Sequence, residues 1–386
     1  MAVSASTHDL MSRLVAVLRE PSEFFWNLSL MGEDQVAMLA QLAGDLTAPK
    51  SVTGDGKFFD SGFAYWGIEP TVAWIQACSD PMYPVMRNSI ESFLPRWERI
   101  QDKVTGTAMH YVSLGPGDGH KDNVILSSLQ SSAGALSYIP VDMSAEMLRM
   151  CIHEPRRTRS ISHDLVLPIQ LDFGDPANLF ALKSLLGNLA GAEPILYSLL
   201  GNTLSNFRDY QTQLGLLAQL LRPQDRFVLE LATTRTLGDR EVEAAAAEYH
   251  RSAAFRTFAT SALVSYTDIP FDMDSVHFEA SVDNGRAILI KVIYRNETGA
   301  NIKFSLANRH LFTFPANDTI RLHITRKHLR SKLDELIRAS NLVQVTAEQQ
   351  DFNHPSSAPF GMDLILLKRA EGDHVSSVVD ALWPRR

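Results

Sequence analysis

The sequence predicts an α/β protein built on a parallel β-sheet. Short apolar runs alternate with stretches whose apolar residues recur at helical spacing, in one series from residue 111 to residue 231. Such alternation is typical of parallel strands that are connected by helices on both faces of a sheet. With 386 residues, 45% of them hydrophobic, the chain can bury a core of this kind. We expect strands at 111–114, 137–141, 166–171, 195–200 and 226–231, with helices at 121–131, 144–151, 176–189 and 209–221.

The segments on either side of this series complete the expected architecture. Residues 7–48 carry apolar side chains three and four positions apart, which predicts helices, and the glycine- and aromatic-rich stretch 49–67 predicts an ordered loop. An alanine-rich helix at 240–259 opens a second, smaller α+β region. We further expect a helix at 88–102, strands at 275–281, 286–295 and 303–306, a helix at 326–339, and strands at 343–348 and 360–368.

Charge and cysteine content argue against several classes of protein. A net charge of −8 and a pI near 5.8 do not favour nucleic acid as a partner, because phosphate binding requires a basic face. Cys78 and Cys151 form no metal spacing and no disulfide framework, which fits a reducing cytoplasm. The first 19 residues lack the pattern of a signal peptide, and we expect no membrane span because no uncharged apolar run approaches ~20 residues.

A glycine-rich turn follows the first expected strand, in the run Leu114-Gly-Pro-Gly-Asp-Gly-His120. Gly115 and Gly117 can let the backbone approach a ligand and adopt positive φ angles. The helix that follows directs its free N–H groups to the same place, where they favour an anion, and Lys121 is near enough to pair with it. A Gly/Pro turn without a ligand explains these residues equally well.

Carboxylates end the next two expected strands. Asp142 can accept hydrogen bonds from both hydroxyls of a ribose, although it could instead cap the helix that starts near Ser144. Asp172 can accept the amino group of an adenine while Phe173 packs on the base, but a capping acid and a core phenylalanine would look the same. Because successive parallel strands end at one edge of a sheet, the three features together predict a nucleoside pocket. S-adenosylmethionine is the best candidate ligand, so we expect a methyltransferase.

Two other functions remain open at this point. A nicotinamide-dependent oxidoreductase would explain the glycine turn and Asp142, but it requires Gly-x-Gly-x-x-Gly, from which this turn departs. A non-catalytic, methyltransferase-like binding domain would bind no cofactor. A nucleic-acid methyltransferase is disfavoured by the acidic balance and by the lack of an Asn/Asp-Pro-Pro-Tyr/Phe motif. The twelve histidines are scattered without metal-ligand spacing, so we expect no metal.

Several segments resemble the histidine-specific S-adenosylmethionine-dependent methyltransferases, a family that includes the histidine Nα-methyltransferase of the ergothioneine pathway. The resemblance implies a Rossmann-like class I methyltransferase sheet with a second, smaller α+β domain, and S-adenosylmethionine as cofactor. It lies in residues 114–121, 138–145 and 200–206, and in the short stretches 49–51, 58–60 and 82–84. By this resemblance the cofactor would be held by Gly115, Gly117, Lys121, Asp142, Asp172 and Phe173.

The resemblance also implies a site for an amino-acid substrate. Asn206 and Tyr83 would bind its amino and carboxylate groups and keep the acceptor nitrogen uncharged, while Gly201 and Thr203 would shape the floor of the site. From the residues alone, Asn206 is better explained as a helix cap and Tyr83 as a loop aromatic.

Two departures from the family fall at the side-chain end of the expected substrate. The family's Glu-x-Ser, whose glutamate grips an imidazole, is replaced by His323-Ile-Thr325, and an expected tyrosine is Phe59. Sites built to hydrogen-bond one group reject analogues that lack it by a factor on the order of 10⁴, so histidine is disfavoured. Arginine or a tryptophan derivative is an alternative. His323 could bind the substrate with Thr325 and receive the departing proton, or it could simply support the sheet.

We therefore predict an S-adenosylmethionine-dependent N-methyltransferase of a free amino acid or close derivative, cytoplasmic and acting in secondary metabolism. The oligomeric state is not predicted. The expected regions are a helical and loop region at 1–104 that contributes to the substrate site, a cofactor-binding core at 105–235, an inserted substrate domain at 236–325, the last helix and strands of the core at 326–370, and a tail at 371–386.

Overall fold

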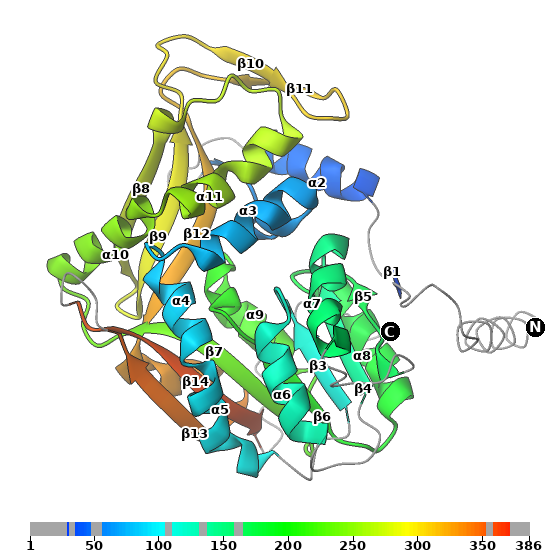
Figure 1. Ribbon diagram of the computed structural model, residues 1–386. Coiled ribbons are helices and arrows are strands. Elements are labelled where there is room, and N and C mark those ends of the chain that lie inside the picture. Colours follow the sequence, from blue (N-terminus) through cyan, green and yellow to red (C-terminus); the bar gives the residue numbers. More distant parts are fainter. Residues whose placement is uncertain are drawn as a thin grey trace, which may run out of the picture.

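The protein contains one large mixed sheet with helices on both faces (Figure 1). The computed structural model describes residues 29–30, 35–47, 56–104, 110–130, 137–157, 165–352 and 358–370. The main path of the sheet is, in spatial order, β1 (Ser29–Leu30), β5 (Ile169–Gln170), β4 (Ser137–Asp142), β3 (His110–Leu114), β6 (Ile195–Leu199), β7 (Arg226–Thr234), β12 (Thr319–Leu329), β9 (Ala287–Arg295) and β8 (Val276–Asp283). Off this path, β14 (Phe360–Arg369) pairs with β7 and with β13 (Leu342–Asp351), and β2 (Lys57–Phe58) pairs with β12.

The strands from β1 to β12 along this path are parallel, which confirms the predicted fold class. Every residue of β3 and β6 is buried, as expected for strands covered on both faces. Alternate residues point to opposite faces, so Val112 and Leu114 enter one hydrophobic cluster and Tyr111 another. The first cluster is covered by α8 (Pro176–Ala190) and α9 (Tyr210–Ala218), and the second by α5 (Phe93–Ile100), α6 (His120–Gln130) and α7 (Ala145–Arg157).

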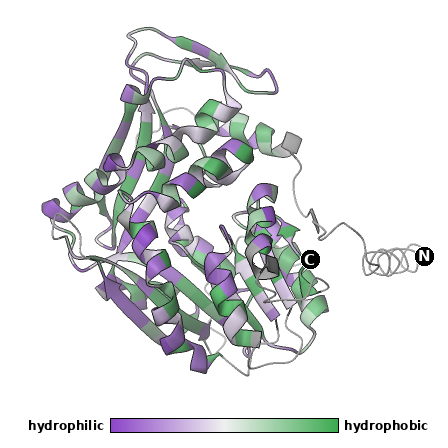
Figure 2. Cartoon of the chain, viewed as in Figure 1, coloured by the Kyte–Doolittle hydropathy of each residue, from purple (hydrophilic) through white to green (hydrophobic). Residues whose placement is uncertain are grey.

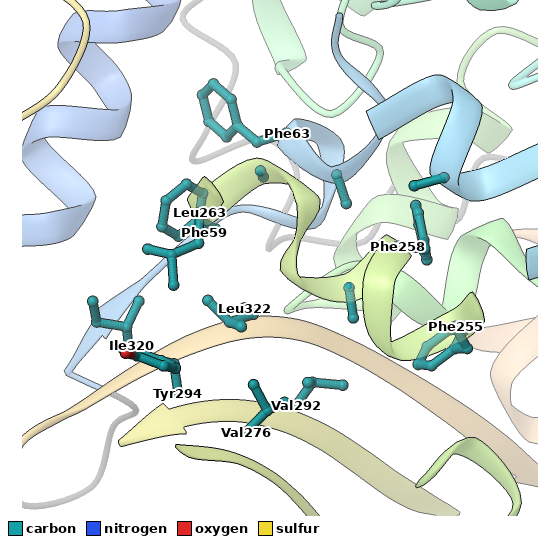
Figure 3. Close-up of a cluster of buried hydrophobic side chains, with 14 of the residues drawn as sticks. Phe59, Phe63, Phe255, Phe258, Leu263, Val276, Val292, Tyr294, Ile320 and Leu322 are labelled. Carbon is teal, nitrogen blue, oxygen red and sulfur yellow. The ribbon is translucent and has the colours of Figure 1, made fainter. Parts of the chain in front are cut away.

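A third hydrophobic cluster joins the beginning of the described chain to the region after residue 236. Phe59 and Phe63 pack in it with Phe258, Val292 and Leu322 (Figure 3). Because β12 pairs with both β9 and β7, the strands β8, β9 and β12 of this region continue the core sheet. The elements involved include α2 (Gln35–Thr47), the 3-10 helix η1 (Ser61–Tyr65), α3 (Ile68–Ser79), α10 (Asp239–Arg251), α11 (Ala253–Tyr266) and the projecting hairpin β10 (Ile302–Ser305) and β11 (Leu311–Phe314).

The expected helix at 326–339 is wrong in its first half. Residues up to Leu329 belong to β12, and only α12 (Leu333–Ala339) is α-helical. The sequence Arg326-Lys-His328 is polar, yet all three side chains are buried, and Arg326 and Lys327 pair with Asp283 and Glu248. Pairing with β9 therefore overrides the local helical pattern.

Smaller differences have local causes. The expected helix at 240–259 is two helices, because the Ser252 hydroxyl accepts the N–H of Phe255 at 2.9 Å and caps α11. The expected helix at 88–102 is likewise divided into α4 (Pro84–Glu91) and α5. The expectations for residues 7–28, 49–55 and 371–386 lie outside the described residues.

Polarity follows this layering. In Figure 2 the central strands are mostly hydrophobic, whereas hydrophilic residues gather on β13 at the edge of the sheet. Within the described part of the chain, no helix combines the length and apolarity that crossing a bilayer requires.

Candidate functional site

A cavity of about 750 Å³ lies at the carboxyl ends of β3, β4, β5 and β6. Open α/β sheets bind their ligands at this edge. Residues 115–118, 142–143, 170–176 and 200–207 contribute to one side of it. The other side is formed by α2, η1, α3 and α4, with the side chains Met38, Gln41, Phe63, Tyr65, Trp74, Met86 and Ile90.

The glycine turn adopts the conformation that its residues predict. Gly115 and Gly117 have φ angles of +66° and +62°, in the left-handed region where a side chain is disfavoured. A methyl group added to Gly117 would lie 2.7 Å from the Trp74 ring, so the turn packs directly beneath that indole. Gly119 has a separate role, because a methyl group there would lie 2.3 Å from the backbone oxygen of Cys151 in α7.

Asp142 and Asp172 both line the cavity at the ends of neighbouring strands. Asp142 Oδ1 accepts the Ser144 N–H at 2.8 Å, whereas the Ser144 hydroxyl itself caps α7 by accepting the N–H of Met147. Burial, together with the charge of Asp172 and against the hydrogen bond from Ser144, raises the pKa of Asp142 to about 7. The two acids are therefore close enough to act on one ligand.

Phe173 lies beside Asp172 and presents an apolar wall to the cavity. Its ring centroid is 6.0 Å from that of Phe207, and Gln213 Nε2 donates a hydrogen bond to the Phe173 carbonyl oxygen at 2.8 Å. An acid next to a fixed aromatic ring fits an adenine base, whose amino group is polar and whose faces are apolar.

Lys121 reaches the cavity from the first turn of α6, but its ammonium group already has partners. Its Nζ atom lies 2.5 Å from both Glu230 Oε2 and Ser89 Oγ. Glu230 is fully buried and also pairs with Arg96 at 2.5 Å. Although burial opposes ionisation, Lys121 and Arg96 together lower the pKa of Glu230 to about 2. The sequence contained no evident signal for this carboxylate.

The loop after β6 brings Gly201, Thr203 and Asn206 to the cavity. Asn206 Nδ2 donates a hydrogen bond to the Tyr65 hydroxyl at 3.1 Å. Asn202 has a positive φ of 68° and supports the loop from below, where its amide donates to Thr325 Oγ1 and to the carbonyl oxygen of Arg326. Thr325 is thus a support of the loop and not part of the cavity lining.

The structure does not bring Tyr83 or His323 to the cavity either. Tyr83 packs against Tyr249 and Phe255, with ring centroids 5.5 and 4.9 Å apart. His323 is buried against the rings of Phe255 and Phe258. Burial, and secondarily the charge of Arg321, lowers the pKa of His323 to about 3. In this position it is a buried core residue that does not line the cavity.

Tyr65 and Trp74 line the cavity without having been predicted as site residues. Their rings meet edge to face, with centroids 6.4 Å apart. Burial raises the pKa of Tyr65 well above its usual value, so the phenol stays protonated and can donate. Phe59, at the position of the expected family tyrosine, is buried in the core. For Tyr65 the only sequence signal was the aromatic content of residues 58–66, and Trp74 had none.

Within the described residues, no cluster of three or more His, Cys, Asp or Glu side chains is arranged to hold a metal ion. The glycine turn, the two acids and the aromatic wall fit an adenosyl cofactor, because they offer close backbone approach, hydroxyl acceptors and an apolar face in one cavity.

Comparisons with known proteins identify the family. The model of the family described as "Histidine-specific methyltransferase, SAM-dependent" matches residues 69–355. Among curated proteins, none is similar enough in sequence to count as a relative.

Solved structures of several methyltransferases are similar over most of their length. A S-adenosylmethionine-dependent methyltransferase from Clostridium acetobutylicum shares 12% identity, with a TM-score of 0.36 over 73% of this chain and 92% of its own. The CcbJ methyltransferase from Streptomyces caelestis shares 13% identity, with a TM-score of 0.35 over 76% and 98%. The Burkholderia thailandensis 1,6-didemethyltoxoflavin-N1-methyltransferase shares 12% identity, with a TM-score of 0.35 over 78% and 88%. Similarity at this level supports no conclusion about the substrate.

The family match covers far more than half of the chain and includes the strands, the glycine turn and both acids of the cavity. The chain therefore belongs to the histidine-specific, S-adenosylmethionine-dependent methyltransferase family.

Proposed function

We propose that this methyltransferase transfers the methyl group to a nitrogen of a free amino acid or a close derivative. The observation that carries the proposal is the composition of the cavity, which combines the glycine turn and two acids with the hydrogen-bonded pair Asn206 and Tyr65. The glycine turn and the two acids suit an adenosyl cofactor, and Asn206 and Tyr65 offer neutral polar groups to the substrate that accepts the methyl group.

We assign the cofactor contacts to the residues at the strand ends. Asp142 would accept hydrogen bonds from the ribose hydroxyls and Asp172 one from the adenine amino group, with Phe173 packed against the base. The N–H groups behind the glycine turn, together with Lys121, would face the carboxylate of the methionyl part. When bound, S-adenosylmethionine supplies a methyl group on a positively charged sulfur.

The acceptor contacts are proposed for Asn206 and Tyr65. The Asn206 amide oxygen can accept a hydrogen bond from an uncharged amine, which leaves the nitrogen lone pair free. Tyr65 remains protonated and can donate to a second polar group of the substrate. Trp74 and Met86 would enclose the remainder of the molecule. The residues contribute by orienting the acceptor, an effect worth roughly 7–11 kcal/mol in well-aligned reactions.

Histidine stays disfavoured as the substrate. By the family resemblance, His323 replaces the imidazole-binding glutamate, so no carboxylate stands at this position to bind an imidazole. We also propose that the N-terminal helices and residues 236–325 act together as the substrate-binding part, because they share one hydrophobic cluster. A cytoplasmic enzyme of secondary metabolism completes the proposal, in keeping with two buried free cysteines.

A substrate screen tests this function. Purified protein is incubated with S-adenosylmethionine and each of the twenty amino acids, their amides, and the corresponding amines, and S-adenosylhomocysteine is quantified. We expect release with one chemical class of amine and little with histidine. Binding of S-adenosylhomocysteine without turnover of any amine would contradict the acceptor assignment while leaving the cofactor site intact.

A further inference from the structure

One carboxylate, that of Glu230 in β7, connects two loops of the cavity. Its Oε1 atom accepts hydrogen bonds from Arg96 Nη2 at 2.5 Å and from the Ser89 hydroxyl at 2.9 Å. Its Oε2 atom accepts the Lys121 ammonium at 2.5 Å and the Gly201 N–H at 2.8 Å. All four donors therefore converge on one fully buried side chain.

Two of the four donors belong to the lining of the cavity. Lys121 comes from the helix behind the glycine turn, and Gly201 comes from the loop that carries Asn206. The other two donors are on α4 and α5, and α4 also contributes Met86 and Ile90 to the cavity lining. A shift of the Glu230 carboxylate would thus move the two loops together.

The charges of this cluster do not cancel. Arg96 and Lys121 contribute two positive charges, Glu230 contributes one negative charge, and all three side chains are buried. Unbalanced buried charge is costly, so an anion beside the cluster would be stabilised. Of the three, Lys121 lines the cavity, so that anion would be bound on the cavity side.

We propose that Glu230 is a positioning residue that holds Lys121 and Gly201 against the amino-acid end of the cofactor. It fixes the Lys121 ammonium at the cavity wall, where the positioned ammonium selects a ligand with a carboxylate. Glu230 does not contact the cofactor. The inference concerns the donor side and does not depend on which amine is methylated.

Two ligands distinguish this role from a merely structural one. S-adenosylhomocysteine has the amino-acid end, whereas 5′-methylthioadenosine has the same nucleoside without it. We expect Glu230→Gln to weaken calorimetric binding of the first by about 10- to 100-fold, because displacement of Lys121 and Gly201 outweighs the added unit of positive charge, with methylthioadenosine affected less than about twofold. Equal weakening of both ligands, or no change in either, would overturn the proposal.

A second variant separates the loss of positioning from a loss of stability. Glu230→Gln leaves two buried cations without an anion, so its melting temperature should fall. Ser89→Ala changes no charge and removes one partner of both Glu230 and Lys121. It should produce the same selective loss, by about 3- to 10-fold. If Ser89→Ala folds and binds both ligands as the native protein does, the proposal depends on Glu230→Gln. It is then overturned unless that variant loses affinity for S-adenosylhomocysteine selectively.

Asp363 provides the matched control. It is also a buried acid of the sheet, bound by Arg330 at 2.6 Å and by Thr233 at 3.1 Å, and it does not line the cavity. Asp363→Asn should lower stability while leaving the ratio of the two affinities unchanged. A shift in that ratio as large as the one in Glu230→Gln would show that general loosening of the sheet suffices, which would also overturn the assignment.

Discussion

The two halves of the cavity are assembled in different ways. The cofactor half comes from the ends of successive strands, with Gly115, Asp142 and Asp172 delivered in chain order to one edge of the sheet. The acceptor half joins Asn206 to Tyr65 and Trp74, more than a hundred residues away along the chain. Strand order positions the first half, and helix packing positions the second. We therefore expect variants in the two halves to separate binding from turnover.

The largest expected effect is in the cofactor half. Asp142→Ala should abolish measurable binding of S-adenosylhomocysteine by calorimetry, a loss of roughly 100-fold or more, because two hydrogen bonds to a carboxylate disappear. Asp209→Ala is the control, since Asp209 is an exposed acid that caps α9 by accepting the Thr212 N–H. It should cost about 1 kcal/mol of stability and no affinity. Retained binding in Asp142→Ala would remove the basis of the ribose assignment.

The acceptor half should respond in the opposite way. Asn206→Ala is expected to reduce turnover by about 100-fold, because a misplaced acceptor loses its alignment with the methyl group. Calorimetric affinity for S-adenosylhomocysteine should stay within a few-fold of the native value. If the variant lost cofactor affinity as severely as Asp142→Ala does, the division into halves would be wrong.

Tyr65 and Tyr83 offer a sharper test within the acceptor half. Tyr65→Phe removes only the hydroxyl that Asn206 contacts, so kcat/KM should fall about tenfold or more. Tyr83→Phe removes a hydroxyl that lies off the cavity and should change kcat/KM much less. The reverse order of effects would favour the residue suggested by the family resemblance over the one suggested by the geometry.

The same contrast explains how much of the fold and of the site could be predicted from the sequence. The parallel strands and most of the cofactor residues follow from apolar runs that end in glycine or aspartate, a local pattern. Tyr65 and Trp74 carry no such pattern, because they enter the site only when η1 and α3 pack on α11. The strand formed by residues 326–329 was missed for a similar reason, since polar side chains there are buried by distant ion pairs.

Ligand affinity and protein stability should depend on pH in opposite directions. Burial raises the pKa of Asp142 to about 7 from an unfolded value of 3.8, so the folded state retains a proton that the unfolded state releases. Its contribution to stability therefore falls as pH rises from about 4 to 7. Ribose hydroxyls favour the ionised acid. Affinity for S-adenosylhomocysteine should therefore increase as the pH rises toward 7, by up to about tenfold per pH unit, and level off above pH 7. Asp142→Asn should bind weakly and show a flat profile; a slope like that of the native protein would assign the titration to another group.

The smallest expected effect comes from a residue where the two halves meet. Gly117→Ala would press a methyl group against Trp74, whose ring also contacts Tyr65, at a φ of +62°. We expect a stability loss of about 1–3 kcal/mol, with severalfold increases in both the cofactor Kd and the KM for the acceptor. Gly187→Ala in α8 meets no atom within 4 Å and should be neutral or stabilising by about 0.4–1 kcal/mol. A Gly117→Ala variant that altered only the cofactor Kd would show that Trp74 belongs to one half alone.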